Sequence, residues 1–233
     1  MKRANRSRSD LRATTPAPPV QLFTGLSAQQ RKLVLHAAES RKFRANRVII
    51  RAGDPATSLF LLTHGRAKYY RVTKKGEQVL LWWLATGDSF GIGTLLAAPL
   101  HYIGTAEAID DCELLVWTRD KIRSLAVSNE RLAQNALQTV LYYLDAYTER
   151  LIGLATGTAE QRLAGTLLQL GRRIGHAGHS GVELSIMNED LAGLANVSAF
   201  TASRLLKEWE RQGIVQKSRG KVSILSPESL LID

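Results

Sequence analysis

The sequence predicts an α+β protein built from an N-terminal antiparallel β-roll, a long central helix and a C-terminal winged helix-turn-helix. Three patterns lead to this prediction. Short β-rich runs broken by glycines fill residues 21–128, and an apolar heptad pattern follows over about 129–155. Two amphipathic helical segments and a hairpin then occupy residues 188–225.

Composition sets the first limits on function. The 233 residues carry 31 Lys and Arg against 21 Asp and Glu, a formal net charge of +10, which suits a polyanionic partner. The single cysteine, Cys112, allows no internal disulfide and no iron–sulfur cluster within one chain. No apolar run reaches about 18 residues, and no apolar segment follows the basic N-terminus. We therefore expect no membrane span, no secretory signal and a cytoplasmic location.

Residues 1–20 are expected to form a disordered basic tail. Arg, Ser and Pro dominate this segment, and Leu11 is its one large apolar side chain between Met1 and Pro19. The segment buries too little surface to offset its ordering entropy.

Residues 21–128 have the pattern of a β-roll. A short helix is expected to open over Leu26–Gln30 and to run to about Ala38, and turn signals then recur about every ten residues. The predicted strands are Val48–Ile50, Leu59–Leu62, Ala67–Val72, Val79–Leu84 and Cys112–Trp117, separated by turns at Gly53-Asp54, Gly65, Gly76, Gly87-Asp88 and Gly91–Gly93.

Residues 129–157 are predicted to form one long helix with an apolar seam. The seam residues are Ala133, Leu137, Val140, Leu144, Tyr147 and Leu151, at alternating spacings of four and three. Such a seam can pack on its own domain, but we favour a parallel coiled coil between two copies of the chain.

Residues 158–233 contain the helix-turn-helix pattern. We expect a short helix over 188–195 with Asn188 as its N-cap, and a second over 199–211 capped by Ser198 and ended by Gly213. On the second helix Ala202, Leu205, Leu206 and Trp209 share one face, and Phe200, Arg204, Lys207 and Arg211 lie on the opposite one.

Two β-rich runs, 214–217 and 222–225, flank Ser218-Arg219-Gly220-Lys221 and predict a basic wing. Lys217, Arg219 and Lys221 are positioned to reach DNA phosphates. A cationic helix face by itself is most often only solvated. Helix, turn, helix and basic wing in this order favour insertion of the second helix into a DNA major groove.

From about residue 21 to 230 the chain resembles the Crp/Fnr family of bacterial transcription regulators. The resemblance lies in Gly65, Gly76 and Gly87-Asp88, in the long helix, and in the pattern Val197-Ser198-x-x-Thr201-x-Ser203-Arg204-x-Leu206-x-x-Trp209-x-x-x-Gly213-Ile214. It implies a cyclic-nucleotide-binding-like sensor roll over 21–128, a dimerisation helix over 129–157 and a DNA-binding domain over 158–233. It further implies a homodimer on near-palindromic promoter DNA and contact with RNA polymerase.

The segment that resembles the family's effector site departs from its pattern. The corresponding residues here are Gly91, Ile92, Gly93, Tyr102, Ile103, Tyr147 and Thr148. Members that bind cyclic AMP carry a Glu where Ile92 stands and Arg-Ser where Tyr102-Ile103 stand. Burying a phosphate monoanion without that cation is costly, so we expect no binding of cyclic AMP.

Other sensing chemistries find little support, and we expect neither a metal nor a cofactor. The cysteine cluster of the oxygen-sensing branch is absent, and the candidate haem ligands are His64, His101 and Cys112. Trp82, Trp83 and Tyr102 leave an apolar metabolite open as effector, although core packing explains their rings equally well.

The second helix also departs from the best-known family pattern, in which Arg and Glu precede the Thr. Here Ala199 and Phe200 stand in their place, while Thr201 and Arg204 remain. Arg204 suits a bidentate guanine contact and Phe200 a thymine methyl. Ser198, Thr201 and Ser203 suit phosphates or caps. We therefore expect a half-site different from the best-known one.

Two other classes of function are weaker. A small-molecule-binding protein whose helix-turn-helix no longer binds DNA would show no salt-sensitive DNA affinity. An enzyme is not expected, because the sequence holds no zinc-type Cys-x-x-Cys, phosphate-binding loop or nucleophile elbow.

Overall fold

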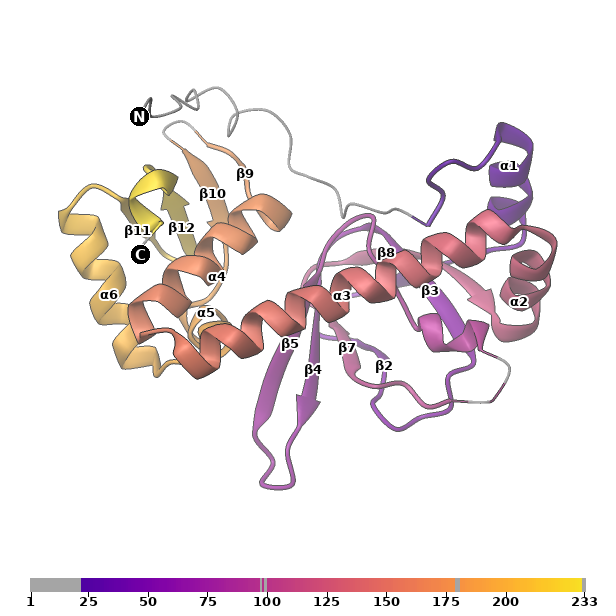
Figure 1. Cartoon of the computed structure of the whole chain (residues 1–233), viewed down its shortest axis with the longest axis horizontal. Coiled ribbons are helices and arrows are strands. Elements are labelled where there is room, and N and C mark those ends of the chain that lie inside the picture. Colours follow the sequence, from indigo (N-terminus) through magenta and orange to yellow (C-terminus); the bar gives the residue numbers. More distant parts are fainter. Residues whose placement is uncertain (1–21, 97, 99, 179–180, 232–233) are drawn as a thin grey trace. The chain divides into compact units, whose positions relative to one another are not determined.

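The computed structural model describes residues 22–96, 98, 100–178 and 181–231 (Figure 1). The predicted disordered tail, residues 1–20, lies outside the described residues. The chain divides between Ile152 and Gly153 into two compact units. The boundary falls inside the long helix α3 (Glu130–Thr156), which the sequence predicted as a separate part. No helix among the described residues is long and apolar enough to cross a membrane.

The first unit is a β-roll of two four-stranded antiparallel sheets, as predicted (Figure 1). Its sheets have the strand orders β1-β8-β3-β6 and β2-β7-β4-β5. The elements are α1 (Ala28–His36), β1 (Glu39–Phe43), β2 (Val48–Ile50), β3 (Ser58–His64), β4 (Ala67–Val72), β5 (Gln78–Leu84), β6 (Ser89–Phe90), the 3-10 helix η1 (Ile92–Leu95), β7 (Thr105–Ala108), β8 (Cys112–Thr118) and α2 (Arg119–Ser128). Strands β1, β6 and β7 and helix α2 add to the predicted set.

Two apolar clusters hold this unit together. One fills the space between the sheets and includes Phe60, Trp82 and Phe90, with the rings of Phe60 and Phe90 stacked at 5.0 Å between centroids. The other includes Trp117 and Leu132 and joins β8 to α1, α2 and the start of α3. The indole N–H of Trp117 donates to the Val34 carbonyl at 2.7 Å, so this buried ring has its polar group satisfied.

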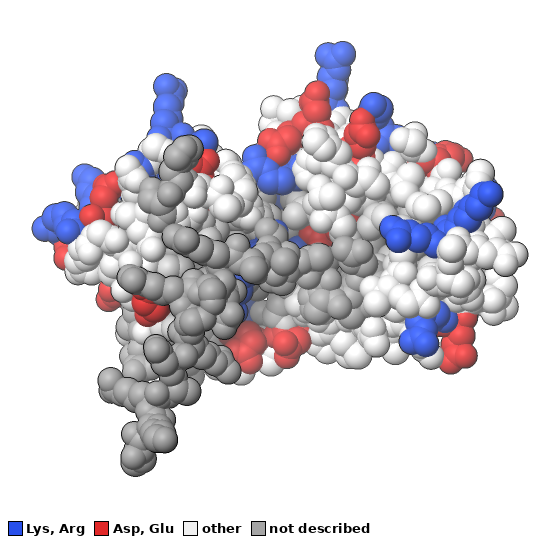
Figure 2. All heavy atoms as spheres, turned by 90° about the horizontal axis from the view of Figure 1, so that it is seen from above, with Lys and Arg blue, Asp and Glu red and all other residues white. Residues whose placement is uncertain are grey.

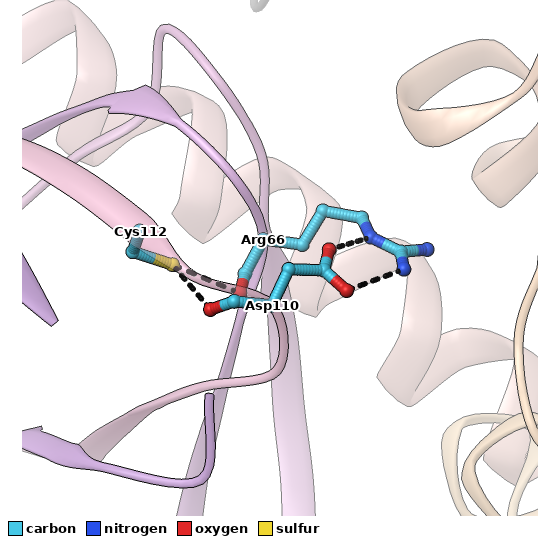
Figure 3. A network of polar contacts seen from close by, with 3 residues as sticks. All are labelled: Arg66, Asp110 and Cys112. Atoms are coloured by element: carbon cyan, nitrogen blue, oxygen red, sulfur yellow. Dashed lines mark hydrogen bonds and ion pairs between the residues drawn. The ribbon is translucent and has the colours of Figure 1, made fainter. Parts of the chain in front are cut away.

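Gly65 lies where the chain turns tightly between β3 and β4. Its φ is +87°, and a Cβ there would lie 2.5 Å from the Asp111 carbonyl oxygen. Next to it, the Arg66 guanidinium makes two hydrogen bonds to Asp110, at 2.6 and 3.0 Å (Figure 3). This bidentate pair joins the turn to the β7–β8 connection. The positive φ and the close Asp111 carbonyl together require glycine at position 65.

The second unit contains the helix-turn-helix and its wing. Its elements are α4 (Ala159–Ile174), β9 (His176–Ala177), β10 (Val182–Ser185), α5 (Asn188–Ala195), α6 (Ala199–Arg211), β11 (Val215–Ser218), β12 (Lys221–Ile224) and the 3-10 helix η2 (Pro227–Leu230). The sheet order is β11-β12-β10-β9, and all of its pairs are antiparallel. The wing is the β11–β12 hairpin, as predicted.

One predicted cap is corrected. The N-cap of α5 is Met187, and Asn188 is already the first helical residue. No side chain caps this helix end. The acidic residues Glu189 and Asp190 in the first turn complement the helix dipole instead.

Candidate nucleic-acid interface and effector position

The turn between α5 and α6 is set by two local features. Asn196 ends α5 in the left-handed conformation, at φ 50° and ψ 51°. Ser198 caps α6, and its hydroxyl accepts a hydrogen bond from the Thr201 amide at 3.0 Å. Gly213, with φ +70°, follows the last turn of α6. The predicted cap and end of α6 are therefore confirmed.

Helix α6 buries one face and exposes the other, as its pattern predicted. Ala202, Leu205, Leu206 and Trp209 are buried in the unit. Phe200 is 79% exposed, and Arg204 and Lys207 are exposed on the same face. Burying the first set leaves the second set pointing outward because the two are about 180° apart on the helix.

The cations of this surface differ in whether they have acidic partners. Arg211 pairs with Glu208 one turn before it. For Arg204, Lys207 and Arg219, no ion pair is found with the described residues. On the face shown in Figure 2, Lys and Arg side chains are interspersed with Asp and Glu rather than gathered in one patch.

The wing positions its three cations differently. Arg219 is exposed at the tip, beside Gly220 with φ +70°. The amide of Lys217 donates to a Glu210 carboxylate oxygen at 2.8 Å, which ties β11 to the end of α6. The ammonium of Lys221 lies 2.7 Å from Glu183 on β10. Lys221 is thus neutralised locally, a feature that the sequence pattern did not reveal.

The remaining predicted DNA-binding residues lie at the start of α6. Ser198, Ala199 and Phe200 are exposed, while Thr201 and Ser203 are half-buried. The Ser198 and Thr201 hydroxyls lie 2.8 Å apart and share a hydrogen bond. This end of the helix presents amide and hydroxyl groups, which is the chemistry that phosphate oxygens require.

Sequence reasoning missed two residues in the first turns of α4. Arg162 donates from Nε to the Ala195 carbonyl at 3.0 Å and from Nη1 to the Gly157 carbonyl at 2.8 Å. Glu160 accepts a hydrogen bond from the Trp209 indole at 3.3 Å. No pattern signals the contacts with Ala195 and Trp209, because they join residues 33 and 49 positions apart.

At the effector position of the roll, Tyr102 is buried. Its hydroxyl donates to the Ser58 carbonyl at 3.1 Å and accepts from the Ser58 amide at 3.0 Å. Gly91 has φ +76°, and a Cβ there would lie 2.5 Å from the Ser58 oxygen and 3.3 Å from the Tyr102 ring. The neighbouring Ile103 is 71% exposed. A phenol that bonds its own backbone therefore stands where the resemblance expects a cation.

The other residues of the predicted pocket separate into different surroundings. Ile92 packs against the cluster that contains Trp117, and a Cβ on Gly93 would lie 3.4 Å from the Leu100 side chain. Thr148 is exposed, and its hydroxyl donates to the Leu144 carbonyl within α3. These seven residues are not presented together as one polar site.

Tyrosines of α3 pack around Trp82 of β5. The ring centroids of Tyr142, Tyr143 and Tyr147 lie 6.1, 5.1 and 5.9 Å from that of Trp82. The ring of Tyr69 covers Gly104, and its hydroxyl interacts electrostatically with Tyr147. Burial, with this interaction, raises the pKa of Tyr147 to about 12. The Tyr147 phenol therefore stays neutral at physiological pH, and the rings of the cluster pack against one another.

Of the predicted dimer seam, most residues form an exposed stripe on α3. Leu137, Leu144 and Leu151 are 60%, 59% and 66% exposed, and Ala133 and Val140 are exposed with them. Leu141 and Ile152 widen the stripe. Tyr147 is the exception, because its ring lies against Trp82. At 100° per residue Tyr147 is about 80° away from Leu137, further than the other seam residues, so it lies at the edge of the stripe.

Cys112 has no features of a reactive thiol. It is buried, and its Sγ lies 3.2 Å from the Arg66 carbonyl and 3.3 Å from the Asp110 carbonyl (Figure 3). Burial, with the Asp110 charge, raises the pKa of the thiol to about 11. The described residues contain no group of three or more His, Cys, Asp or Glu that could hold a metal ion. His64 and His101, the other candidate haem ligands, are exposed.

Comparison with known proteins agrees with this architecture. Residues 40–129 match the cyclic nucleotide-binding domain, and residues 161–231 match the Crp-like helix-turn-helix domain. The cyclic AMP receptor protein of Thermus thermophilus is 28% identical over 203 residues, which are 87% of this chain and 91% of that protein. The fumarate and nitrate reduction regulatory protein of Salmonella typhimurium is 23% identical, over 82% of this chain and 76% of that protein.

Solved structures share the fold. The structure of FixK2 from Bradyrhizobium japonicum has a TM-score of 0.73 at 21% identity, covering 83% of this chain and 95% of that one. The catabolite activator protein of Thermus thermophilus is 28% identical, with a TM-score of 0.53, and covers 90% of this chain and 95% of that one. The family to which these matches point is one of transcription regulators and not of enzymes. The chain is a member of the Crp/Fnr family of transcription regulators, with a helix-turn-helix DNA-binding domain.

Proposed function

We propose that this regulator binds a near-palindromic promoter site as a homodimer and reads each half-site with residues 199–211. The observation that carries the proposal is the outward face of α6, where Phe200, Arg204 and Lys207 are exposed opposite a fully buried stripe. Arg204 suits a guanine edge and Phe200 a thymine methyl. The DNA phosphate backbone would be contacted by Ser198, Thr201, Ser203, Lys217, Arg219 and Lys221.

The apolar stripe of α3 supports the homodimer. Its leucines are more than half exposed in a single chain, and a symmetric partner would remove them from water. A twofold pair would place two α6 helices in successive major grooves, about 34 Å apart. Promoter binding of this kind implies a role with RNA polymerase.

We further propose that cyclic AMP is not the effector. The buried Tyr102 hydroxyl is committed to Ser58, and Ile103 brings no charge. A cyclic phosphate there would lose hydration without gaining a cation. A different small ligand, haem or an apolar metabolite, is the alternative effector that would control DNA binding.

Selection from a pool of random duplexes with the purified full chain tests the proposal. The expected product is a two-half-site sequence bound by two copies in sedimentation, with an affinity that falls steeply as salt rises. Calorimetric titration with cyclic AMP is expected to show no micromolar binding. A monomer at every concentration, with and without the selected duplex, would refute the homodimer. DNA affinity that ignores salt would favour a small-molecule binder that has lost DNA recognition.

A further inference from the structure

One arginine links the ends of two helices in the DNA-binding unit. Arg162 lies in the first turn of α4, immediately after the linker that follows α3. Its Nη1 donates to the Gly157 carbonyl, one residue beyond the end of α3, at 2.8 Å. Its Nε and Nη2 donate to the Ala195 and Asn196 carbonyls, at the end of α5, at 3.0 and 3.3 Å.

The C-terminal carbonyls of a helix lack partners within the helix and carry a partial negative charge. A cation with several N–H donors can both donate hydrogen bonds to these carbonyls and balance their negative charge. Arg162 does this for two helix ends at once, which its planar fork of N–H groups allows and a lysine would not. The half-buried position of Arg162 strengthens these bonds relative to an exposed contact.

The linker itself has little freedom to compensate. The Gly157 amide donates to the Gly153 carbonyl at 2.9 Å, and a Cβ on Gly157 would lie 2.8 Å from that oxygen. Thr158 then starts α4 with a capping box completed by Gln161. Glu160, on the same turn, accepts the Trp209 indole hydrogen bond from α6. The start of α4 thus contacts the linker, the turn and the second helix of the helix-turn-helix.

We infer that Arg162 is a positioning residue that fixes the direction of α6 relative to the end of α3. The inference rests on the proposed homodimer, in which α3 sets the separation of two reading helices. With Arg162 in place, the helix-turn-helix is held to the end of α3, so the dimer accepts one spacing between half-sites. Without it, the helix-turn-helix is held to α4 by the Trp209–Glu160 contact but loses its bonds to the Ala195 and Asn196 carbonyls. The dimer then accepts other spacings at a lower affinity for the best one.

The test measures spacing selectivity with the full chain. The affinities of wild type and Arg162→Gln are compared on the selected duplex and on versions with one base pair added or removed between half-sites. Wild type is expected to reject the altered spacings, and Arg162→Gln is expected to reduce the ratio of best to altered affinity about fivefold or more. Arg172→Gln is the matched control, because it removes an exposed cation from the last turn of the same helix.

Arg162→Lys separates geometry from charge. It keeps the cation and α4, so a folded variant is expected even if Arg162→Gln is unstable. If the fork matters, the lysine variant also loses spacing selectivity while its affinity for an isolated half-site stays within about twofold of wild type. Unchanged selectivity in a folded Arg162→Lys, and in Arg162→Gln where it folds, overturns the inference and leaves the proposed function intact. If wild type shows no two-half-site binding, the proposed function fails instead.

Discussion

The two units of this chain treat their aromatic side chains in opposite ways. In the β-roll, the rings at the effector position are buried against one another, with Trp82 surrounded by tyrosines and Tyr102 bonded to Ser58. In the DNA-binding unit the ring of Phe200 is exposed beside Arg204 and Lys207. The aromatic groups of the roll therefore stabilise the unit itself, whereas the exposed ring of α6 is available to a partner.

Paired alanine variants give the largest expected effect. Trp82→Ala is expected to reduce the free energy of unfolding of the first unit by about 3–5 kcal/mol, since it empties space between the sheets. Phe200→Ala is expected to change the stability of its own unit by less than about 0.5 kcal/mol, since the ring is exposed. Urea unfolding followed by tryptophan fluorescence measures the first effect and calorimetry the second. Similar losses of unfolding free energy in the two variants would contradict the proposed difference between the buried and the exposed rings.

The Cys112 thiol tests whether the roll is closed. With its pKa raised to about 11 from 9.0, the folded thiol is ionised to about one part in a thousand at pH 8, against about one in ten for an ordinary thiol. Alkylation by iodoacetamide is therefore expected to be about 100-fold slower in the folded chain than in urea. Equal rates would show that the roll opens readily.

The same shift has a consequence for stability at high pH. The folded thiol keeps its proton to higher pH than the unfolded thiol, so the folded state binds more protons between pH 9 and about 11. Its stabilising contribution is complete below pH 9 and is lost as the pH rises through about 11. Cys112→Ala is expected to flatten the fall in stability over that interval, measured by urea unfolding at each pH.

Arg204 gives the next effect, in the DNA-binding unit. Arg204→Ala is expected to cost about 1–3 kcal/mol of discrimination at one base pair of each half-site. This discrimination is measured by comparing affinities for versions of the selected duplex that carry each of the four base pairs at that position. Arg211→Ala is the control, because Arg211 already pairs with Glu208 and is expected to change affinity without changing base preference. An unaltered preference in Arg204→Ala would show that another face of α6 reads the bases.

Sequence patterns predicted what depends on local order. Period and capping placed α6, its buried stripe and its Ser198 cap correctly, because these depend on neighbours within four residues. The glycine turns and alternating runs likewise placed five strands of the roll. Strands β1, β6 and β7 were not predicted, because β1 and β7 contain few large apolar residues and β6 has only two residues.

The sites divide in the same way. Exposure of Phe200 and Arg204 followed from helical angle alone. The hydrogen bonds of Arg162 to Ala195 and Asn196 did not, since these partners are 33 and 34 positions away. Nor did the N-cap of α5, where Asn188 is the favoured residue type but the chain bends one residue earlier, at Met187. Tyr147 fitted a heptad and yet contacts Trp82, because it lies at the edge of the stripe and its contact with β5 depends on tertiary packing that spacing does not encode.

The smallest expected effect concerns the wing, where charges are partly matched. Glu183 neutralises Lys221 at 2.7 Å, and the imidazole of His176 lies 3.7 Å from the same carboxylate oxygen. A phosphate that approaches Lys221 must displace Glu183 and is repelled by it. Glu183→Gln is therefore expected to tighten binding to all sequences by about 0.2–1 kcal/mol, the usual value of an exposed pair, with no change in base preference.

The double variant decides whether this gain comes through the pair. In Glu183→Gln with Lys221→Ala, the gain is expected to disappear, because no ammonium remains to be released. Lys221→Ala alone is expected to weaken binding only slightly and to lower the salt slope by less than Arg219→Ala does, since Arg219 has no such acidic neighbour among the described wing residues. Equal salt slopes for the two single variants would mean that the Lys221–Glu183 ion pair opens in the DNA complex at no cost. Lys221 would then contact DNA as freely as Arg204 and Lys207 of α6, which are exposed.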